Sequence, residues 1–290
     1  MSDGAGGWSI TWRRFARSRL ALGALAYVAC ISILAAGAPL LATSSRSGPI
    51  PFGPNDVDIA SRLQPPGAHH RLGTDDIGRD VLSRMLHGAR VSLAVGFLAT
   101  AIALIIGSTL GALAGYYGGA TDWVISRLIE IILCFPFLFL VLGIVALFGP
   151  SLYTIMIALG VTSWTTEARF VRAEFLRIRE QEFAIAARAS GAGDARIIFR
   201  HLLPNALAPV LVSASFGVAS AILTESALSF LGFGVPIPTA TWGSILSTAE
   251  QHIEQAWWLV TFPGVAIFLT VAAFNIIGDR FRDALDPRSE

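Results

Sequence analysis

The sequence predicts an all-α membrane protein with about six transmembrane helices, as its composition and the spacing of its charges indicate. Of its 290 residues, 54% are hydrophobic and only 14% are charged, whereas a soluble domain usually carries about a quarter charged residues. The ionisable residues gather in clusters that long charge-free stretches separate, which is typical of a polytopic chain. The net charge of +1 gives no global electrostatic case for binding nucleic acid.

Six stretches are candidates for helices that cross the membrane, since roughly 20 apolar residues span ~30 Å of hydrocarbon. One long apolar interval is divided at Gly149-Pro150, where a helix is expected to break. The first stretch follows four arginines and is longer than the core of a secretory signal, so we interpret it as an uncleaved span, with a cleavable signal as the alternative. The expected spans are 20–42, 91–115, 123–148, 151–170, 206–230 and 257–278.

The segments between the spans are expected to be mostly irregular. Residues 43–66 are rich in Pro, Gly and Ser and read as a linker. Residues 229–242 are apolar but broken by prolines and glycines, so they must lie against protein, line a cavity or lie outside the membrane. Residues 248–255 are expected to form a short outer helix. We divide the chain into 1–70 (cytoplasmic tail, first span and outer linker) and 71–290 (a five-helix core with a cytoplasmic loop at about 171–205).

Arginine placement gives the orientation. Four arginines precede the first span, and the positive-inside rule holds that end in the cytoplasm. With six spans, the C-terminal end and the arginine-rich loop return to the same side. The outward region between the first two spans also contains arginines, which weakens the rule there, although aspartates partly offset them. The arginines are Arg62, Arg71, Arg79, Arg84 and Arg90, and the aspartates are Asp56, Asp58, Asp75, Asp76 and Asp80.

The sequence places the energy source outside this chain. It contains no lysine, and a Walker-type ATP site needs one in its GxxxxGK[ST] loop. An ion-coupled carrier would need carboxylates in the membrane, and we considered Glu130 and Glu225. Arg127, three residues before Glu130, favours an i,i+3 ion pair over a proton relay. Glu225 fits a transport pathway and a structural hydrogen bond equally well. An ion-gradient-driven secondary transporter therefore stays as the alternative.

The loop over 182–205 is the place where a partner would dock. We expect an alanine-rich helix that stops at Gly191, followed by a second short helix capped by Asp194 and ended by Pro204. The second helix has an apolar edge and a basic edge. Such an exposed helix-turn-helix suits a cleft on another protein, and an amphipathic loop on the membrane surface fits equally well. The apolar edge is Ile197, Ile198 and Leu202, and the basic edge is Arg196 and Arg200.

This loop resembles the EAA loop of ABC-importer permeases, whose pattern is E-A-A-x-x-x-G with a later I-x-L-P. Its alanines, its glycine and the ending over 202–204 match, while Ile185 replaces the leading glutamate. The resemblance implies coupling helices that sit in a groove of an ATPase subunit. The implied coupling residues are Ala186, Ala187, Arg188, Gly191, Asp194, Arg196, Arg200 and Pro204.

Further segments resemble dipeptide, oligopeptide and nickel permeases of the C-subunit type. They are residues 72–84 (LGTDDIGRDVLSR), 88–93, 115–119, 225–232 and 283–288. The resemblance implies the type I ABC importer permease fold in a bacterial inner membrane, with short peptides as cargo and a pathway bordered by the third to fifth spans. Glu225 and Ser229 are the candidate pathway residues.

The same resemblance implies the partners and leaves the exact cargo open. The expected partners are a homologous second permease, two ATP-binding subunits that use ATP and Mg, an extracytoplasmic substrate-binding protein and the lipid bilayer. This chain itself is expected to have no catalytic residues, metal or cofactor. A dipeptide, a longer peptide, a glutathione-like peptide and a nickel chelate all remain open as cargo.

Weaker signals concern packing and metal binding. Gly107, Gly111 and Gly115 form a flat face for close helix packing, within this chain or against the partner permease, and we favour the former. The adjacent His69 and His70 suggest a metal-binding site, but adjacent histidines in a linker are expected to be solvated. Cys30 and Cys134 are expected to pack as small hydrophobic residues.

Overall fold

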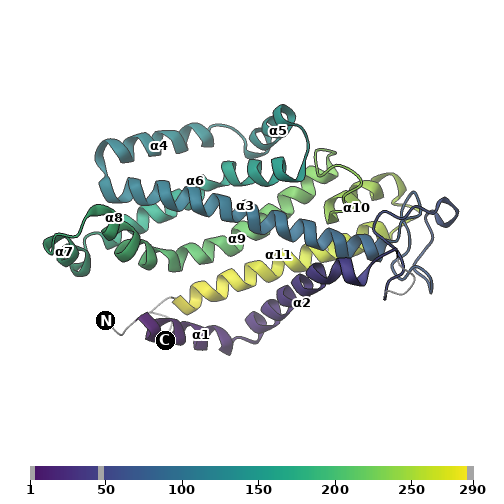
Figure 1. The fold of residues 1–290 in the computed structure, drawn as a ribbon, viewed down its shortest axis with the longest axis horizontal. Coiled ribbons are helices and arrows are strands. Elements are labelled where there is room, and N and C mark those ends of the chain that lie inside the picture. The colour runs from purple at the N-terminus through teal and green to yellow at the C-terminus, as the bar shows by residue number, and fades with distance from the viewer. Residues whose placement is uncertain (1–3, 45–48, 286–290) are drawn as a thin grey trace.

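The protein is a bundle of long helices with shorter ones at its two ends (Figure 1). The computed structural model describes residues 4–44 and 49–285, and within these ranges there are only isolated β-bridges and no strand. The all-α prediction is therefore confirmed. The helices are α1 (Gly4–Arg17), α2 (Arg19–Leu41), α3 (Val81–Tyr117), α4 (Gly119–Leu133), α5 (Phe137–Phe148), α6 (Leu152–Ile178), α7 (Glu182–Ala189), α8 (Asp194–Arg196), α9 (Leu203–Phe230), α10 (Trp242–Ala249) and α11 (Trp258–Leu285).

Four helices among the described residues are long and apolar enough to cross a membrane, or five spans if the bent α4–α5 pair counts as one. The four lie in α2, α3, the part of α9 from Pro209 to Phe230, and α11. The remaining predicted span, 151–170, is the first part of α6. That helix is 27 residues long, but its hydroxyl and charged side chains give it a lower mean hydropathy than the four helices above. It packs along α3 inside the bundle.

The span predicted over 123–148 is not one continuous helix but a bent pair, α4 and α5. The chain bends by 85° between α4 and α5. Pro136 at the break has an extended ψ of 128°. Proline lacks the N–H that a continuous helix needs and forces the residue before it out of the helical region. Arg172 of α6 holds α4 by donating from Nη2 to Asp122 Oδ2 at 2.7 Å.

The glycine face of α3 packs within the chain, as favoured above. A Cβ added at Gly111 would lie 2.4 Å from the carbonyl oxygen of Ala168 in α6, and Gly107 and Gly115 face the same helix as closely. Only glycine permits this approach of two backbones. Helix α3 also begins ten residues before the predicted span, because Asp80 caps it by accepting a hydrogen bond from Ser83 N at 2.8 Å.

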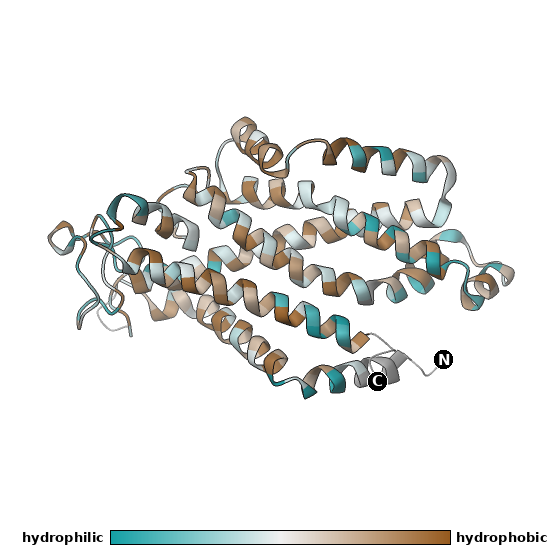
Figure 2. Ribbon diagram, turned by 180° about the vertical axis from the view of Figure 1, so that it is seen from behind, coloured by the Kyte–Doolittle hydropathy of each residue, from teal (hydrophilic) through white to brown (hydrophobic). Residues whose placement is uncertain are grey.

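The two ends of the bundle differ. Helix α1, the end of α11 and the α7–α8 loop lie at one end, whereas the segment between α2 and α3 lies with α10 at the other (Figure 1). Apolar residues predominate along the helices, and hydrophilic residues gather towards both ends (Figure 2). The free Cys30 and Cys134 are exposed on the bundle surface rather than packed inside it.

A buried ionic network holds the end that carries α10. Asp75 accepts hydrogen bonds from the backbone N of Arg79 at 2.9 Å and from its Nε at 2.6 Å, and Arg84 Nε lies 3.6 Å from the same carboxylate. The expectation of a solvated His69-His70 is wrong for His70, which is 7% exposed and bonds through Nδ1 to Asp80 at 2.9 Å. Two of the outward-region arginines that weaken the positive-inside rule are therefore paired internally, with Asp75 between them and Asp76 at 3.9 Å from Arg79.

The short outer helix lies earlier than predicted. Helix α10 ends at Ala249, so the range 248–255 contains the end of this helix and a 3₁₀ turn over Glu250–His252. The helix begins where Thr241 and Ser244 form a reciprocal capping box, so the local capping chemistry fixes its start.

Candidate functional site

The predicted helix-turn-helix exists, although its second half is built differently. Helix α7 stops at Ser190, and Gly191 adopts a left-handed φ of 76°, a conformation that favours glycine. Asp194 is the first residue of α8 and makes no capping bond, so the prediction that it caps the helix is wrong. Pro204 does not end a helix either: a π-helical turn over Ile197–Leu202 leads into α9, and Pro204 lies in its first turn, where no N–H is needed.

The loop divides into a buried edge and an exposed face. Ile197, Ile198 and Leu202 are buried against α6, in a cluster that includes Phe175 and Ile178. Their apolar edge is therefore already used within the chain. The outer surface carries Ile185, which is 53% exposed. The other exposed positions are Ala186, Arg188, Gly191, Asp194, Arg196, Arg200 and Pro204, whereas Ala187 is half-buried.

Tyr116 fastens this loop to the end of α3. Its hydroxyl donates to Asp194 Oδ1 at 2.7 Å, and the guanidinium of Arg188 lies 5.4 Å from the centre of its ring. Arg179, at the end of α6, donates from Nη1 to the carbonyl oxygen of Gly115 at 3.0 Å. Sequence analysis missed this role of Tyr116, since nothing in the sequence relates it to a residue 78 positions later.

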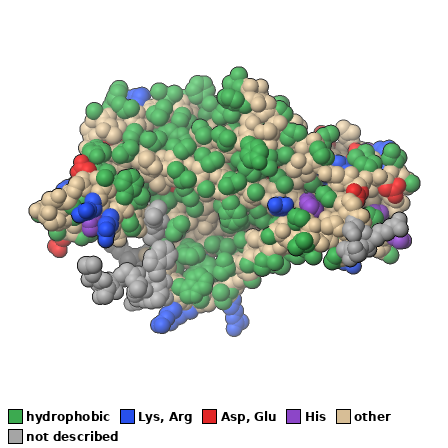
Figure 3. Space-filling model, in the orientation of Figure 1, with side chains coloured by type: hydrophobic (Ala, Val, Ile, Leu, Met, Phe, Trp, Pro, Cys, Tyr) green, Lys and Arg blue, Asp and Glu red, His purple; other side chains and the backbone are tan. Residues whose placement is uncertain are grey.

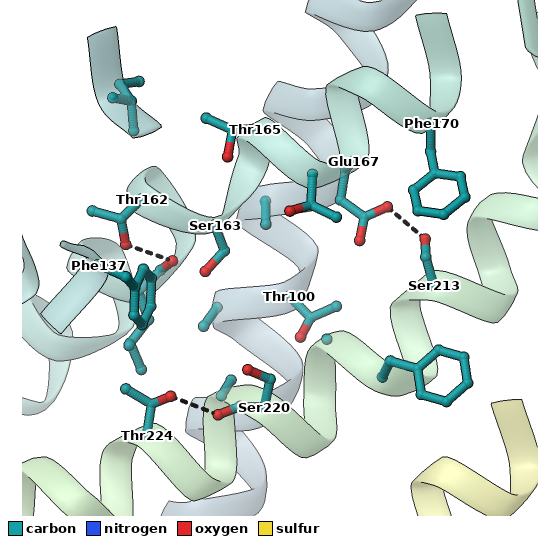
Figure 4. Close-up of a pocket in the computed structure, with 18 of the residues that line it drawn as sticks. Thr100, Phe137, Thr162, Ser163, Thr165, Glu167, Phe170, Ser213, Ser220 and Thr224 are labelled. Atoms are coloured by element: carbon teal, nitrogen blue, oxygen red, sulfur yellow. Dashed lines mark hydrogen bonds between the residues drawn. The ribbon is translucent and has the colours of Figure 1, made fainter. Parts of the chain in front are cut away.

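A cavity of about 770 Å³ opens between α3, α5, α6 and α9 (Figure 4). Aromatic and aliphatic side chains form part of its wall, and Arg282 of α11 also borders it. The rest of the wall is polar, and most of it consists of hydroxyl groups. The polar lining residues are Thr100, Thr162, Ser163, Thr165, Thr166, Glu167, Ser213, Ser220 and Thr224.

Glu167 of α6 is the acidic residue of this wall. It is 6% exposed, and Ser213 Oγ of α9 donates to its Oε2 at 2.5 Å. Figure 4 shows its other oxygen turned towards the interior of the cavity. Sequence analysis considered Glu130 and Glu225 and missed Glu167, although it is an acidic residue within the predicted span 151–170. Its position was the available signal, because carboxylates in spans are rare and functional.

The two carboxylates that sequence analysis considered have structural partners. Glu130 forms the predicted ion pair with Arg127, on an exposed face of α4. Glu225 is fully buried and accepts hydrogen bonds from Ser229 Oγ at 2.7 Å and Ser92 Oγ at 3.4 Å. This arrangement agrees with the structural hydrogen bond that was one of the two alternatives for Glu225. Neither Glu225 nor Ser229 belongs to the cavity wall, and their pathway role stays a prediction.

Metal ligands do not gather in the described part of the chain: no three His, Cys, Asp or Glu side chains there are placed to hold an ion. Long apolar helices, a cavity with a partly polar wall among them and a protruding helical loop at one end together define a polytopic membrane protein of the transport class.

The chain belongs to the family of binding-protein-dependent transport system inner membrane components, which residues 107–290 match. Residues 7–66 match the N-terminal transmembrane domain of oligopeptide transport permease C. The dipeptide transport system permease protein DppC of Alkalihalophilus pseudofirmus is 45% identical, over 97% of this chain and 90% of its own length. The oligopeptide transport system permease protein OppC of Haemophilus influenzae is 40% identical, over 99% of this chain and 90% of its own.

Solved structures support the same fold. An inward-facing conformation of the MetNI methionine ABC transporter superposes with a TM-score of 0.57, covering 71% of this chain and 98% of that chain at 22% identity. The architecture is that of a type I ABC importer permease, as the sequence resemblance implied.

Proposed function

We propose that this chain is the transmembrane permease subunit of an ATP-driven importer that carries dipeptides or oligopeptides across a bacterial inner membrane. The observation that carries the proposal is the exposed α7–α8 loop, which Tyr116 and Arg179 tie to the end of α3. The names of the relatives supply the cargo class. No observation favours the ion-gradient alternative.

The proposal assigns ATP and Mg to partners. Since the chain lacks the lysine of a P-loop, two ATP-binding subunits would hydrolyse ATP, and this subunit would carry no catalytic residue. A homologous second permease would complete the pathway, and a substrate-binding protein would deliver peptide at the outer end. Within this chain, residues 71–290 form the proposed transport core, and residues 1–70 add helices α1 and α2 beside it.

The proposed coupling runs through Tyr116. Closure of the ATPases would move the α7–α8 loops, and the hydrogen bond between Tyr116 and Asp194 would pass that movement to α3. Helix α3 is packed against α6 without intervening side chains at its glycine face, so the two would move as a unit. Rigid-body rocking of such units is one established route to alternating access.

The first test is to purify the complex through this chain from its native membrane. The proposal expects two ATP-binding subunits and a second permease to accompany it. A homodimer of this chain alone would contradict it.

The second test concerns the docking face. Replacing both Arg196 and Arg200 by Glu reverses the exposed basic edge without touching the buried residues beside it, and we expect it to abolish recovery of the ATPases. The matched control reverses Arg280 and Arg282 of α11 at the same end of the bundle. Full recovery of ATPases by the loop variant would show that the loop is not their docking site.

A further inference from the structure

We propose that Glu167 and Ser213 form a site for an organic ammonium ion, the N-terminal ammonium of the peptide cargo, on the wall of the cavity. This inference rests on the proposed function and deepens it by assigning a specificity-determining residue. The site is the place where α6 and α9 meet across the cavity (Figure 4).

The first argument is the unmet bonding capacity of Glu167. An ionised carboxylate can accept about four hydrogen bonds, and one hydroxyl, that of Ser213, donates to it at 2.5 Å. Among the described residues, no arginine or histidine forms an ion pair with it. A carboxylate buried to this extent is costly unless a cation or further donors reach it. The cavity is the side from which they can come.

The second argument is the chemistry of the surrounding wall. Phe170 lies beside the Glu167–Ser213 pair (Figure 4), and an aromatic face attracts a desolvated cation. Hydroxyl groups such as Ser163, Ser220 and Thr224 offer partners to peptide N–H and C=O groups without selecting a side chain. A wall of this kind suits a ligand with one fixed positive charge and a variable remainder.

The third argument is size. A cavity of about 770 Å³ lies within the range of small-ligand sites, which is about 300–1,000 Å³. It is therefore large enough to hold a short peptide. A bare metal ion fits poorly, because Glu167 is the single carboxylate among the residues that line the cavity and hard cations take several oxygen ligands, mostly charged ones.

The experiment uses the complete transporter in lipid vesicles. Glu167→Gln keeps the size and a hydrogen-bond acceptor for Ser213, so a purely structural bond between α6 and α9 survives while the charge is lost. We expect import of dialanine to fall about tenfold, with ATP hydrolysis stimulated by the binding protein unchanged within twofold. Glu130→Gln, which removes the same charge from the exposed face of α4, is the matched control and should import normally.

A second measurement detects the ligand without transport. In a chain with Cys30 and Cys134 replaced by alanine, Ser220→Cys places one thiol on the cavity wall, and its rate of maleimide labelling is followed. Dialanine should slow labelling at least threefold, N-acetyl-dialanine should not, and Glu167→Gln should remove the protection.

The outcomes separate this site from the proposed function. Equal import and equal protection in Glu167→Gln and the unchanged chain would overturn the ammonium site while leaving the importer intact. Protection by N-acetyl-dialanine equal to that by dialanine would overturn it as well. If the unchanged vesicles import no peptide although dialanine protects the thiol, the site stands and the proposed function fails.

Discussion

At the scale of single residues, Tyr116 joins two parts of the chain that the sequence keeps 78 positions apart. Its ring lies beneath the guanidinium of Arg188, and its hydroxyl bonds to Asp194. A neutral hydrogen bond contributes only about 0.5–1.5 kcal/mol to stability, and one to a charged group about 1.5–3 kcal/mol. The contact is therefore strong enough to transmit a movement, yet its loss should leave the fold intact.

The variant Tyr116→Phe tests that role. It removes the hydroxyl and keeps the ring, so we expect the ATPases to bind as before while peptide import per ATP hydrolysed falls between two- and tenfold. The measurement is simultaneous import and phosphate release in vesicles. Tyr117→Phe is the control, since Tyr117 is 52% exposed. An unchanged ratio of import to hydrolysis in Tyr116→Phe would remove this residue from the coupling path.

At the scale of elements, the close packing of α3 on α6 holds the core together. The Cβ positions of Gly107, Gly111 and Gly115 would all collide with α6. Because the collision at Gly111 is with a backbone carbonyl, no change of rotamer relieves it. Van der Waals packing of this kind is the main attraction between helices in lipid, where burial of apolar surface gains nothing.

The variant Gly111→Leu should therefore separate α3 from α6. We expect most of the purified protein to aggregate or to lose its partners, as measured by size-exclusion chromatography in detergent. Gly23→Leu in α2 is the control, because nothing lies within 4 Å of the Cβ position there, and it should behave like the unchanged chain. Normal elution of Gly111→Leu would show that the two helices tolerate a wider spacing.

Apolar runs predicted the existence of the helices but not their shape. Hydropathy carries no information on backbone torsion angles, so the apolar run around Pro136 was predicted to be the middle of one span. The start of α3 was missed because its first turns carry polar and charged residues that are buried in the outer network. Pro204 was taken as a stop signal because the π-helical turn before it leaves no mark in the sequence.

The candidate site also has one part that could be predicted from the sequence and one part that could not. The α7–α8 loop could be predicted because its glycine, its alanines and its charges follow local rules. The cavity could not, since its wall combines residues from six helices whose spacing only the packed bundle defines. Glu167 could have been found from its position in a span. Its partner Ser213, 46 residues away, could not.

At the scale of the whole molecule, the exposed apolar surface indicates where lipid or another subunit must lie. Hydrophobic side chains cover the middle of the face in Figure 3, and charged ones gather near the two ends. Helices α4 and α5 contribute many of the exposed hydrophobic side chains of the protein, including Trp123, Phe139 and Phe148, each more than 60% exposed. A surface this large and apolar is stable only in a membrane or against a partner.

The two ends of this surface allow the orientation to be tested. The end with α1 and the α7–α8 loop carries many exposed arginines, such as Arg188, Arg196 and Arg200, whereas Arg79 and Arg84 at the other end are buried and paired with Asp75. By the positive-inside rule, the loop end should therefore face the cytoplasm. In the chain with Cys30 and Cys134 replaced by alanine, Ala60→Cys should react with a membrane-impermeant maleimide in intact spheroplasts. Ala189→Cys should react only after lysis.

Both positions are exposed in the structure, so a difference in labelling reports the side of the membrane rather than burial. Labelling after lysis is the control that each thiol is reactive. The opposite pattern would place the α7–α8 loop outside the cell, where it could meet no ATP-binding subunit, and would therefore overturn the coupling assignment together with the orientation. Reaction of both thiols in intact spheroplasts would do the same, because it would bring the loop to the outer side.

The expected pattern requires an odd number of crossings between residues 60 and 189. The bundle provides three if α3, the bent α4–α5 pair and α6 each cross once, which makes the bent pair a full span rather than a hairpin that returns to the same side.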